Sequence, residues 1–250
     1  MRRFEDKVVL VTGGASGIGK ATALRYAKEG GKVAVGDRNV EGANVVAEQI
    51  RAEGGEAYGF GVDVSQPESA RAAVAGVVEH YGKLNVLANI AGVGGFAHTT
   101  EETLDHWNTL IAVNLTGSFL MAQASLPHIL ASRGNIVLCG STAGIKSHPY
   151  AAAYCASKGG VVMLTSALAV EYAAKKIRVN CVCPGGVETG IIAQFAPPPG
   201  ADMSQIMRIA PIMGRMGKSE EIASAFAYIA SDEARYVNGS IFVVDGAMTT

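Results

Sequence analysis

The sequence predicts an α/β protein built as one doubly wound domain, a seven-stranded parallel sheet with helices on both faces. Two observations predict it. Short apolar runs alternate with helical patterns along all 250 residues, as expected for parallel strands joined by helices. The first apolar run also ends in a glycine-rich turn that opens a helix. Because no linker composition interrupts the chain, we expect a single domain over residues 1–250 that holds both the cofactor site and the catalytic site.

The expected strands are short runs rich in apolar and β-branched residues. They span Lys7–Val11, Lys32–Gly36, Glu56–Gly61, Leu84–Ala88, Gly134–Cys139, Arg178–Cys183 and Ser240–Val244. Ligands of such sheets bind beyond the carboxyl ends of the strands. The polar and glycine residues discussed below follow these strands, so they are expected to meet at one edge of the sheet.

The first strand is followed by Thr12-Gly13-Gly14-Ala15-Ser16-Gly17-Ile18-Gly19, and a helical run covers Lys20 to Glu29. Glycines let the backbone turn tightly beside a pyrophosphate, and a helix start offers N–H groups to the phosphates. The spacing is Gly-x-x-x-Gly-x-Gly, which differs from the Gly-x-Gly-x-x-Gly of many dinucleotide folds. A flexible turn is the alternative. The strand and helix around the turn favour a dinucleotide site made by Gly13, Ser16, Gly17, Ile18 and Gly19.

Asp37 ends the second strand, roughly twenty residues after the turn, where a carboxylate can bind the adenosine ribose. The alternative is a turn residue at a strand end. A carboxylate there repels the 2′-phosphate of NADP, so NAD is the favoured cofactor. The neighbouring Arg38 leaves three options open: it pairs with a 2′-phosphate, stacks against adenine or stays solvated.

Tyr154 and Lys158 stand four residues apart, and Ser141 precedes the tyrosine by thirteen residues. Residues at i and i+4 of a helix share a face, so the lysine ammonium is expected to favour ionisation of the phenol. A phenol with a pKa near about 10 is a poor base until its pKa is lowered. Tyr154 is then expected to exchange the proton of an alcohol or ketone, with Ser141 holding the substrate oxygen. The pair Tyr-x-x-x-Lys alone also fits an ordinary helix face.

Together these motifs resemble the short-chain dehydrogenase/reductase family, from about Asp6 to Gly246. The resemblance implies a Rossmann-type fold and a nicotinamide cofactor. It further implies that Lys158 contacts the nicotinamide ribose and that Asn114 holds a water linking this lysine to solvent. In this chain Ile90 replaces the second asparagine of the family's Asn-Asn-Ala-Gly, so we expect a difference in stability without a change of chemistry. The remaining cofactor contacts that the resemblance implies are Asp63, Val64, Asn89, Ala91, Gly92, Pro184, Gly185, Val187 and Thr189.

The predicted activity is hydride transfer between NAD(H) and a secondary alcohol or ketone, with Tyr154 as general acid and base. Two other functions stay open. An NADPH-dependent reductase of 3-oxoacyl thioesters would use the same four residues, Asn114, Ser141, Tyr154 and Lys158, and Asp37 disfavours it. A noncatalytic NAD-binding sensor could share the fold, and the intact set of four disfavours it.

The substrate is expected under a lid formed by residues 186–217. This segment is apolar and rich in methionine, which adapts to varied shapes and favours a hydrophobic or cyclic substrate. Ordinary packing at a subunit surface is the alternative. Phe96, His148 and Glu188 are further candidates for the substrate pocket, although His148 beside Pro149 also fits a loop histidine.

The helix that begins near Tyr154 is apolar on nearly every side as far as Val170. Such a helix needs burial all round, and a sheet covers only one face. We therefore expect a homo-oligomer, with a tetramer as the favoured assembly.

Composition narrows the remaining options. A net charge of −1 gives no general reason to expect nucleic acid or an anionic membrane as partner. Without a signal-like or membrane-spanning run of about 18 apolar residues, a cytoplasmic protein is expected. No metal site is predicted, since no cluster has convincing ligand spacing. Cys181 and Cys183, two apart on one expected strand, are placed on opposite faces and so are poor joint ligands.

Overall fold

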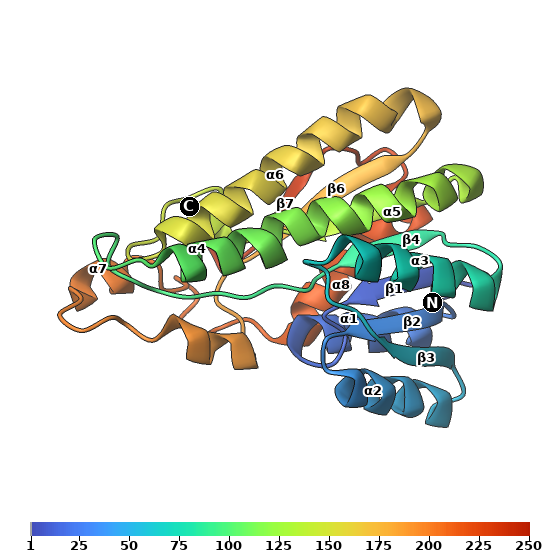
Figure 1. Ribbon diagram of the computed structural model, residues 1–250, viewed down its shortest axis with the longest axis horizontal. Coiled ribbons are helices and arrows are strands. Elements are labelled where there is room, and N and C mark those ends of the chain that lie inside the picture. Colours follow the sequence, from blue (N-terminus) through green and yellow to red (C-terminus); the bar gives the residue numbers. More distant parts are fainter. Residues whose placement is uncertain (1) are drawn as a thin grey trace.

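The computed structural model describes residues 2–250. A seven-stranded sheet of parallel strands forms its centre, with the order β3-β2-β1-β4-β5-β6-β7 (Figure 1). The strand order reverses direction between β1 and β4, the point at which doubly wound sheets open a crevice for ligands. The predicted fold class is confirmed.

All seven expected strands are present, and their ends differ from the expectation by at most two residues. They are β1 (Val8–Thr12), β2 (Lys32–Asp37), β3 (Glu56–Gly61), β4 (Val86–Asn89), β5 (Asn135–Cys139), β6 (Arg178–Pro184) and β7 (Ile241–Val244). The α-helices are α1 (Gly17–Lys28), α2 (Val40–Ala52), α3 (Pro67–Tyr81), α4 (Leu104–Leu110), α5 (Gly117–Ser132), α6 (Ala152–Tyr172), α7 (Met203–Met207) and α8 (Ser219–Ala230). Shorter helical turns are a π-helical turn η1 (Ile111–Thr116) between α4 and α5, and 3₁₀ turns η2 (Thr142–Gly144), η3 (Ala173–Lys175), η4 (Gly190–Phe195) and η5 (Asp232–Ala234).

The sheet carries one apolar core on each face. In β1 the side chains of Val9 and Val11 belong to one core, whereas Val8 and Leu10 belong to the other, as the period of two residues requires. The first core is closed by α1, α2 and α8, and the second by α3, α5 and α6. The central strands β1, β4 and β5 are therefore buried on both sides, whereas the edge strands β3 and β7 are mostly half-buried.

The expectation for Cys181 and Cys183 is wrong. Both side chains lie in the core beneath α6, and their sulfur atoms are 3.7 Å apart. A strand repeats every two residues, so positions i and i+2 share a face. The two thiols are buried side by side, and among residues 2–250 no group of three potential metal ligands surrounds them or any other point.

The replacement of asparagine by Ile90 is accommodated by Thr12 at the end of β1. The Thr12 hydroxyl donates to Oδ1 of Asn89 at 2.6 Å and accepts the main-chain N–H groups of Ile90 and Ala91. The Asn89 amide in turn donates to Ser118 of α5 at 3.0 Å. The link between β1, β4 and α5 is thus made without a second asparagine, while Ile90 packs against the α1 side of the sheet.

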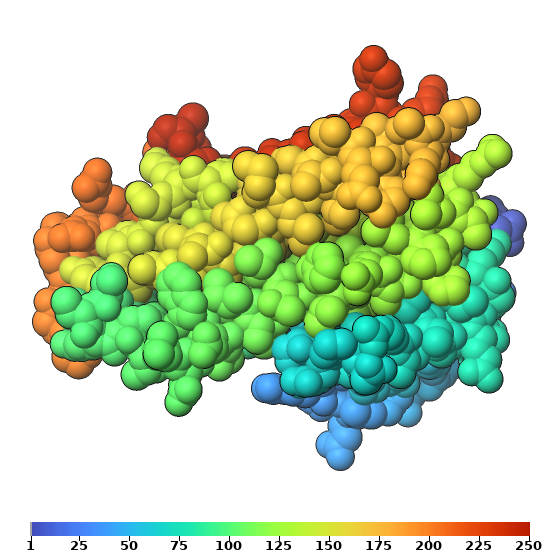
Figure 2. Space-filling view, turned by 45° about the horizontal axis from the view of Figure 1, so that its top comes forward, coloured from blue at the N-terminus to red at the C-terminus, as the bar shows by residue number. Residues whose placement is uncertain are grey.

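Two helical stretches, Leu104–Ser132 and Ala152–Lys175, are long and apolar enough by length and composition to cross a membrane. Each is packed along the sheet, and 50% and 44% of their apolar windows are buried in the fold. Figure 2 shows α5 and α6 side by side across one broad face, with residues around 190–215 at one end. Buried core helices pass the same composition test, so these stretches are weak indicators of a membrane.

Candidate active site

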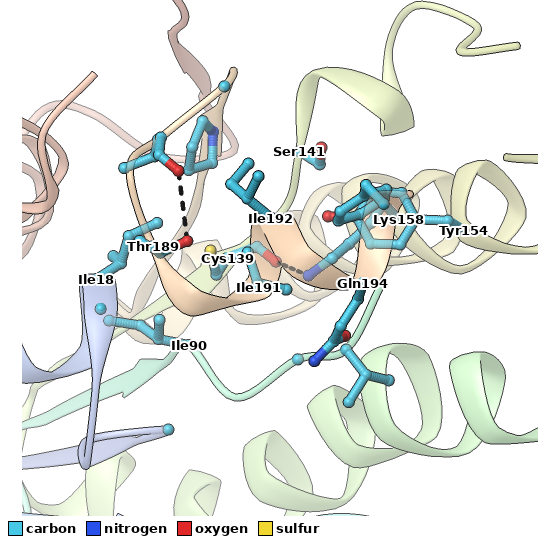
Figure 3. A pocket seen from close by; sticks show the side chains of 18 of the residues that line it. Ile18, Ile90, Cys139, Ser141, Tyr154, Lys158, Thr189, Ile191, Ile192 and Gln194 are labelled. Carbon is cyan, nitrogen blue, oxygen red and sulfur yellow. Dashed lines mark hydrogen bonds between the residues drawn. The ribbon is translucent and has the colours of Figure 1, made fainter. Parts of the chain in front are cut away.

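A cavity of about 800 Å³ lies beyond the carboxyl ends of the strands. Nearly every residue predicted from the sequence lines it, from the glycine turn at one end to Tyr154 at the other. The exceptions are Asn89 and Asn114, which are buried behind its wall, and Glu188, which is exposed to solvent. Figure 3 shows Ser141, Tyr154 and Lys158 gathered on one side and Ile18 and Ile90 on the other.

The backbone of the glycine turn is packed so closely that two of its positions leave no space for a side chain. A Cβ at Gly13 would lie 2.8 Å from the backbone of Ala91, and one at Gly19 would lie 1.9 Å from the Gly13 carbonyl. Gly17 also has a φ of +50°, which favours glycine. At the start of α1, no side-chain cap from Ser16 and no acidic residue in the first turn is found among the described residues. This helix start is therefore available to a phosphate.

Asp37 is held against this turn by two backbone hydrogen bonds. One carboxylate oxygen accepts the N–H of Ala15 at 3.0 Å, and the other accepts the N–H of Asn39 at 2.8 Å. Each oxygen keeps a lone pair for a ribose hydroxyl. The glycine turn and the uncapped start of α1 fit the pyrophosphate of a dinucleotide, and the fixed Asp37 carboxylate fits its adenosine ribose.

The remaining residues predicted to bind the cofactor form the walls beside this cradle. Thr189 lies directly over the turn, because a Cβ at Gly17 would come within 3.1 Å of its side chain. Gly185 packs against Asp245, where a Cβ would approach within 2.8 Å. Also along the cavity are Arg38, Asp63, Val64, Ala91, Gly92, Pro184 and Val187.

Ser141 follows β5 and begins the turn η2. Its hydroxyl accepts the N–H of Ala143 at 3.1 Å, a local cap that fixes the side chain at the cavity wall. The side chain is buried and lines the cavity. A hydroxyl held in this way can still donate its proton to a substrate oxygen.

Tyr154 lies in the first turn of α6 and is 8% exposed. Burial raises the pKa of its phenol above the ordinary value, and the Lys158 ammonium and the Ser141 hydroxyl both act to lower it. Lys158 thus acts on the pKa in the predicted direction, but in this structure burial outweighs the lysine and the serine together. Positive charge placed beside the phenol would bring its pKa down further.

Lys158 lies one turn along α6, buried at 4% exposure. Its Nζ donates to the main-chain carbonyl of Cys139 at 2.9 Å and lies 6.0 Å from the centre of the Tyr154 ring. Figure 3 shows this ammonium directed across the cavity floor toward β5. The end of β5 therefore fixes the cation that faces the phenol.

Asn114 lies in the π-helical turn η1, a feature often found at functional sites. Its side-chain oxygen accepts the N–H of Val93 at 2.9 Å, and its amide donates to the Val93 carbonyl and to Ser157. Asn114 and Lys158 both approach Gly92. A Cβ at Gly92 would lie 3.1 Å from Asn114 Oδ1 and 3.4 Å from Lys158 Nζ.

The substrate end of the cavity is mainly apolar. Phe96 and His148 line it, as predicted. Burial, aided by the charge of Lys146, lowers the pKa of His148 to about 4, so its ring is neutral near pH 7. The lid segment contributes Ile191, Ile192, Phe195, Met207 and Met216 to the cavity lining, whereas Met203, Ile212 and Met213 do not line it.

Some lining residues escaped sequence reasoning. Gln194 is a polar residue inside the apolar lid, and its side-chain oxygen accepts the N–H of Gly94 at 2.8 Å. Met248 also lines the cavity. The Thr142 hydroxyl donates to its sulfur, and Lys146 donates to its main-chain carbonyl at 3.1 Å. The isolated polarity of Gln194 is a readable signal. Nothing in the sequence pattern indicates the placement of Met248.

Comparisons with known proteins show which family the chain resembles. The family model described as Enoyl-(Acyl carrier protein) reductase matches residues 13–249. Cyclohexanol dehydrogenase of Acinetobacter sp. (strain SE19) is 41% identical, covering 99% of this chain and 97% of its own. The 2,5-dichloro-2,5-cyclohexadiene-1,4-diol dehydrogenase of Sphingobium indicum is 40% identical, with 98% and 96% covered. A dehydrogenase/reductase from Sinorhizobium meliloti 1021 superposes with a TM-score of 0.90 at 30% identity, with 99% and 96% covered.

The fold and the site define an oxidoreductase that works with a nicotinamide cofactor. The chain belongs to the short-chain dehydrogenase/reductase family, and its named relatives act on CH–OH groups.

Proposed function

We propose that this protein is an NAD-dependent dehydrogenase of an uncharged, hydrophobic secondary alcohol, with a cyclic alcohol as the favoured class. The observation that carries the proposal is the continuity of one cavity, which joins the Asp37 and glycine end to the end with Ser141 and Tyr154. A dinucleotide lying along it would bring its reactive ring to the phenol.

The proposed chemistry divides between cofactor and protein. NAD, when bound, supplies the acceptor for the hydride that leaves the carbinol carbon. The Tyr154 phenolate removes the hydroxyl proton, and Ser141 donates a hydrogen bond to the same oxygen. Lys158 stabilises the phenolate electrostatically and binds the nicotinamide ribose. Asn114 supports the proton path through its position beside Lys158 and Gly92.

The preference for NAD over NADP is supported by Asp37. Its carboxylate is fixed by two backbone N–H groups and cannot turn away from an incoming phosphate without losing them. A 2′-phosphate placed there would meet a negative charge in a partly enclosed site. In this proposal the side chain of Arg38, next to Asp37 in the chain, stacks against the adenine or stays solvated.

The substrate class is supported by the charges along the cavity. Its charged lining residues are Asp37, Arg38 and Asp63 at the adenosine end, and Lys158, which lies near Tyr154 and donates one hydrogen bond to Cys139. Among the described residues, no charged side chain lines the substrate end, where an anionic carrier group of an acyl thioester would need a partner. The relative named cyclohexanol dehydrogenase points to the same class.

The experiment follows nicotinamide reduction by absorbance, with NAD or NADP and a panel of cyclic alcohols, linear secondary alcohols and 3-hydroxyacyl thioesters. Turnover with NAD and cyclic alcohols is expected. Faster turnover of the thioesters with NADP would favour the reductase alternative. NADH binding without any turnover would favour a noncatalytic sensor.

We also propose a cytoplasmic homo-oligomer, with a tetramer favoured. Support comes from α6, where Met163 is 68% exposed and Val170 is 81% exposed. Figure 2 shows α6 lying beside α5 on one broad face of the molecule. A second subunit would cover this apolar surface. Sedimentation at micromolar concentration tests the assembly, since a monomer would contradict it.

A further inference from the structure

Two segments distant in sequence are joined over the substrate end of the cavity. Gly94 belongs to the loop after β4, and Gln194 and Phe195 belong to the lid turn η4 and line the cavity. The side-chain oxygen of Gln194 accepts the Gly94 N–H at 2.8 Å. The Phe195 ring rests directly on Gly94, because a Cβ at that glycine would lie 2.2 Å from the ring. Only glycine at position 94 permits this contact.

The Phe195 ring is also wedged against the catalytic end. It meets the Tyr154 ring edge-to-face, with centroids 5.0 Å apart and planes at 76°. It meets Phe96 in the same way at 5.1 Å and 75°. Phe195 therefore occupies the space beside the phenol, where the body of a substrate must fit. Its position sets the width of that space.

The chain beyond Phe195 is tied to the same neighbourhood. A ring nitrogen of His98 lies 2.9 Å from the Pro199 carbonyl, and the Tyr150 hydroxyl accepts the N–H of Asp202 at 2.8 Å. Tyr150 is in turn linked to the loop after β4, since its carbonyl accepts the N–H of Ala97. Figure 1 shows this loop running to the same end of the molecule as α7. The lid is thus fastened at two places, and the first is the one that fixes Phe195.

We infer that Gly94, Gln194 and Phe195 form a latch that holds the lid against Tyr154 and makes Phe195 the residue that selects compact ring alcohols over bulky ones. Gln194 and Gly94 are positioning residues, which act through Phe195. The selectivity part rests on the proposed function, whereas the latch itself is a property of the protein without substrate.

Hydrogen exchange tests the latch without any substrate. Gly94→Ala pushes the Phe195 ring away, and Gln194→Leu removes the hydrogen bond at an exposed position that folding tolerates. In both variants the amides of residues 190–202 are expected to exchange about tenfold faster or more. Gly76→Ala is the control, because a Cβ there meets nothing within 4 Å. Unchanged exchange in Gln194→Leu would overturn the latch.

Phe195→Ala tests selectivity. The ratio of kcat/KM for a fused-ring alcohol such as 1-decalol to that for cyclohexanol is expected to rise about tenfold or more. As a second measurement, the dissociation constants of 1-decalone and cyclohexanone from the enzyme–NADH complex are compared. Phe195→Ala is expected to strengthen binding of the fused-ring ketone relative to the single-ring ketone. An unchanged ratio, or no binding of either ketone, would overturn the assignment. Full activity in Tyr154→Phe would refute the proposed function instead and would leave the exchange result standing.

Discussion

Lys158 donates from its buried ammonium to the main-chain carbonyl of Cys139 at 2.9 Å. A buried cationic side chain is costly unless it is hydrogen-bonded, so this carbonyl at the end of β5 offsets part of the cost of burying Lys158 near Tyr154. Ser141 follows two residues after the end of this strand. One strand end therefore places both the cation and the hydroxyl around the phenol.

Lys158→Met is expected to shift the pH dependence of alcohol oxidation. Oxidation requires the Tyr154 phenolate, so kcat/KM rises with pH through the pKa of that phenol. Burial raises this pKa and Lys158 lowers it, so loss of the ammonium moves the rising limb to higher pH. We expect a shift of about one pH unit or more, measured from pH 6 to 11. A limb at the wild-type position in Lys158→Met would contradict the electrostatic role.

Asp37→Asn is expected to weaken NADH binding about tenfold and to reduce the discrimination against NADPH. The substitution removes the negative charge beside the ribose while keeping the size of the side chain. Fluorescence titration of both reduced cofactors measures the two dissociation constants. Glu41→Gln, on the exposed first turn of α2, is the matched control and should bind as the wild type does. An unchanged ratio of the two constants would remove Asp37 from cofactor selection.

Glu29→Gln is expected to destabilise the fold by about 3 kcal/mol. Glu29 is buried and accepts hydrogen bonds from Arg3, at 2.6 and 2.7 Å, and from Arg25. Burial raises its pKa, but the two arginines outweigh burial and hold the pKa below 4.5. The stabilisation is therefore present above about pH 4.5 and is lost as pH falls through the lower, folded-state pKa.

Urea unfolding at pH 7 and at acid pH measures this effect. The difference between wild type and Glu29→Gln should shrink at the lower pH, where the wild-type carboxyl is also protonated. Glu68→Gln breaks an exposed pair with Arg71 and should cost less than about 1 kcal/mol. Equal costs for the two substitutions would refute the special role of Glu29.

Much of the fold could be predicted because its signals are local. Each strand is a short apolar run bounded by glycine or polar residues, and the burial of β1, β2 and β5 on both faces keeps those runs apolar. The residues that follow the strands meet at one edge because parallel strands all end there. Ser141 and Asp37 could thus be placed in one cavity from the sequence.

The parts that were missed depend on tertiary contacts. Gln194 stands out in the sequence as a polar residue in an apolar segment, but its hydrogen-bond partner Gly94, a hundred residues earlier, is visible only in the fold. Met248 reaches the cavity because the chain after β7 folds back to Thr142. Glu188 was a candidate for the substrate pocket, but in the fold its side chain is exposed to solvent. The error at Cys181 and Cys183 had another source, since the strand period itself places both on one face.

The central claim is that Tyr154 is the proton acceptor, and the most direct test compares Tyr154→Phe with wild type for NAD reduction by cyclohexanol. Tyr236→Phe is the control, because that side chain is fully exposed. We predict that Tyr154→Phe binds NADH with an unchanged dissociation constant and loses at least about a hundredfold in kcat/KM, while the control keeps full activity. Turnover within a few-fold of wild type in Tyr154→Phe would contradict the account.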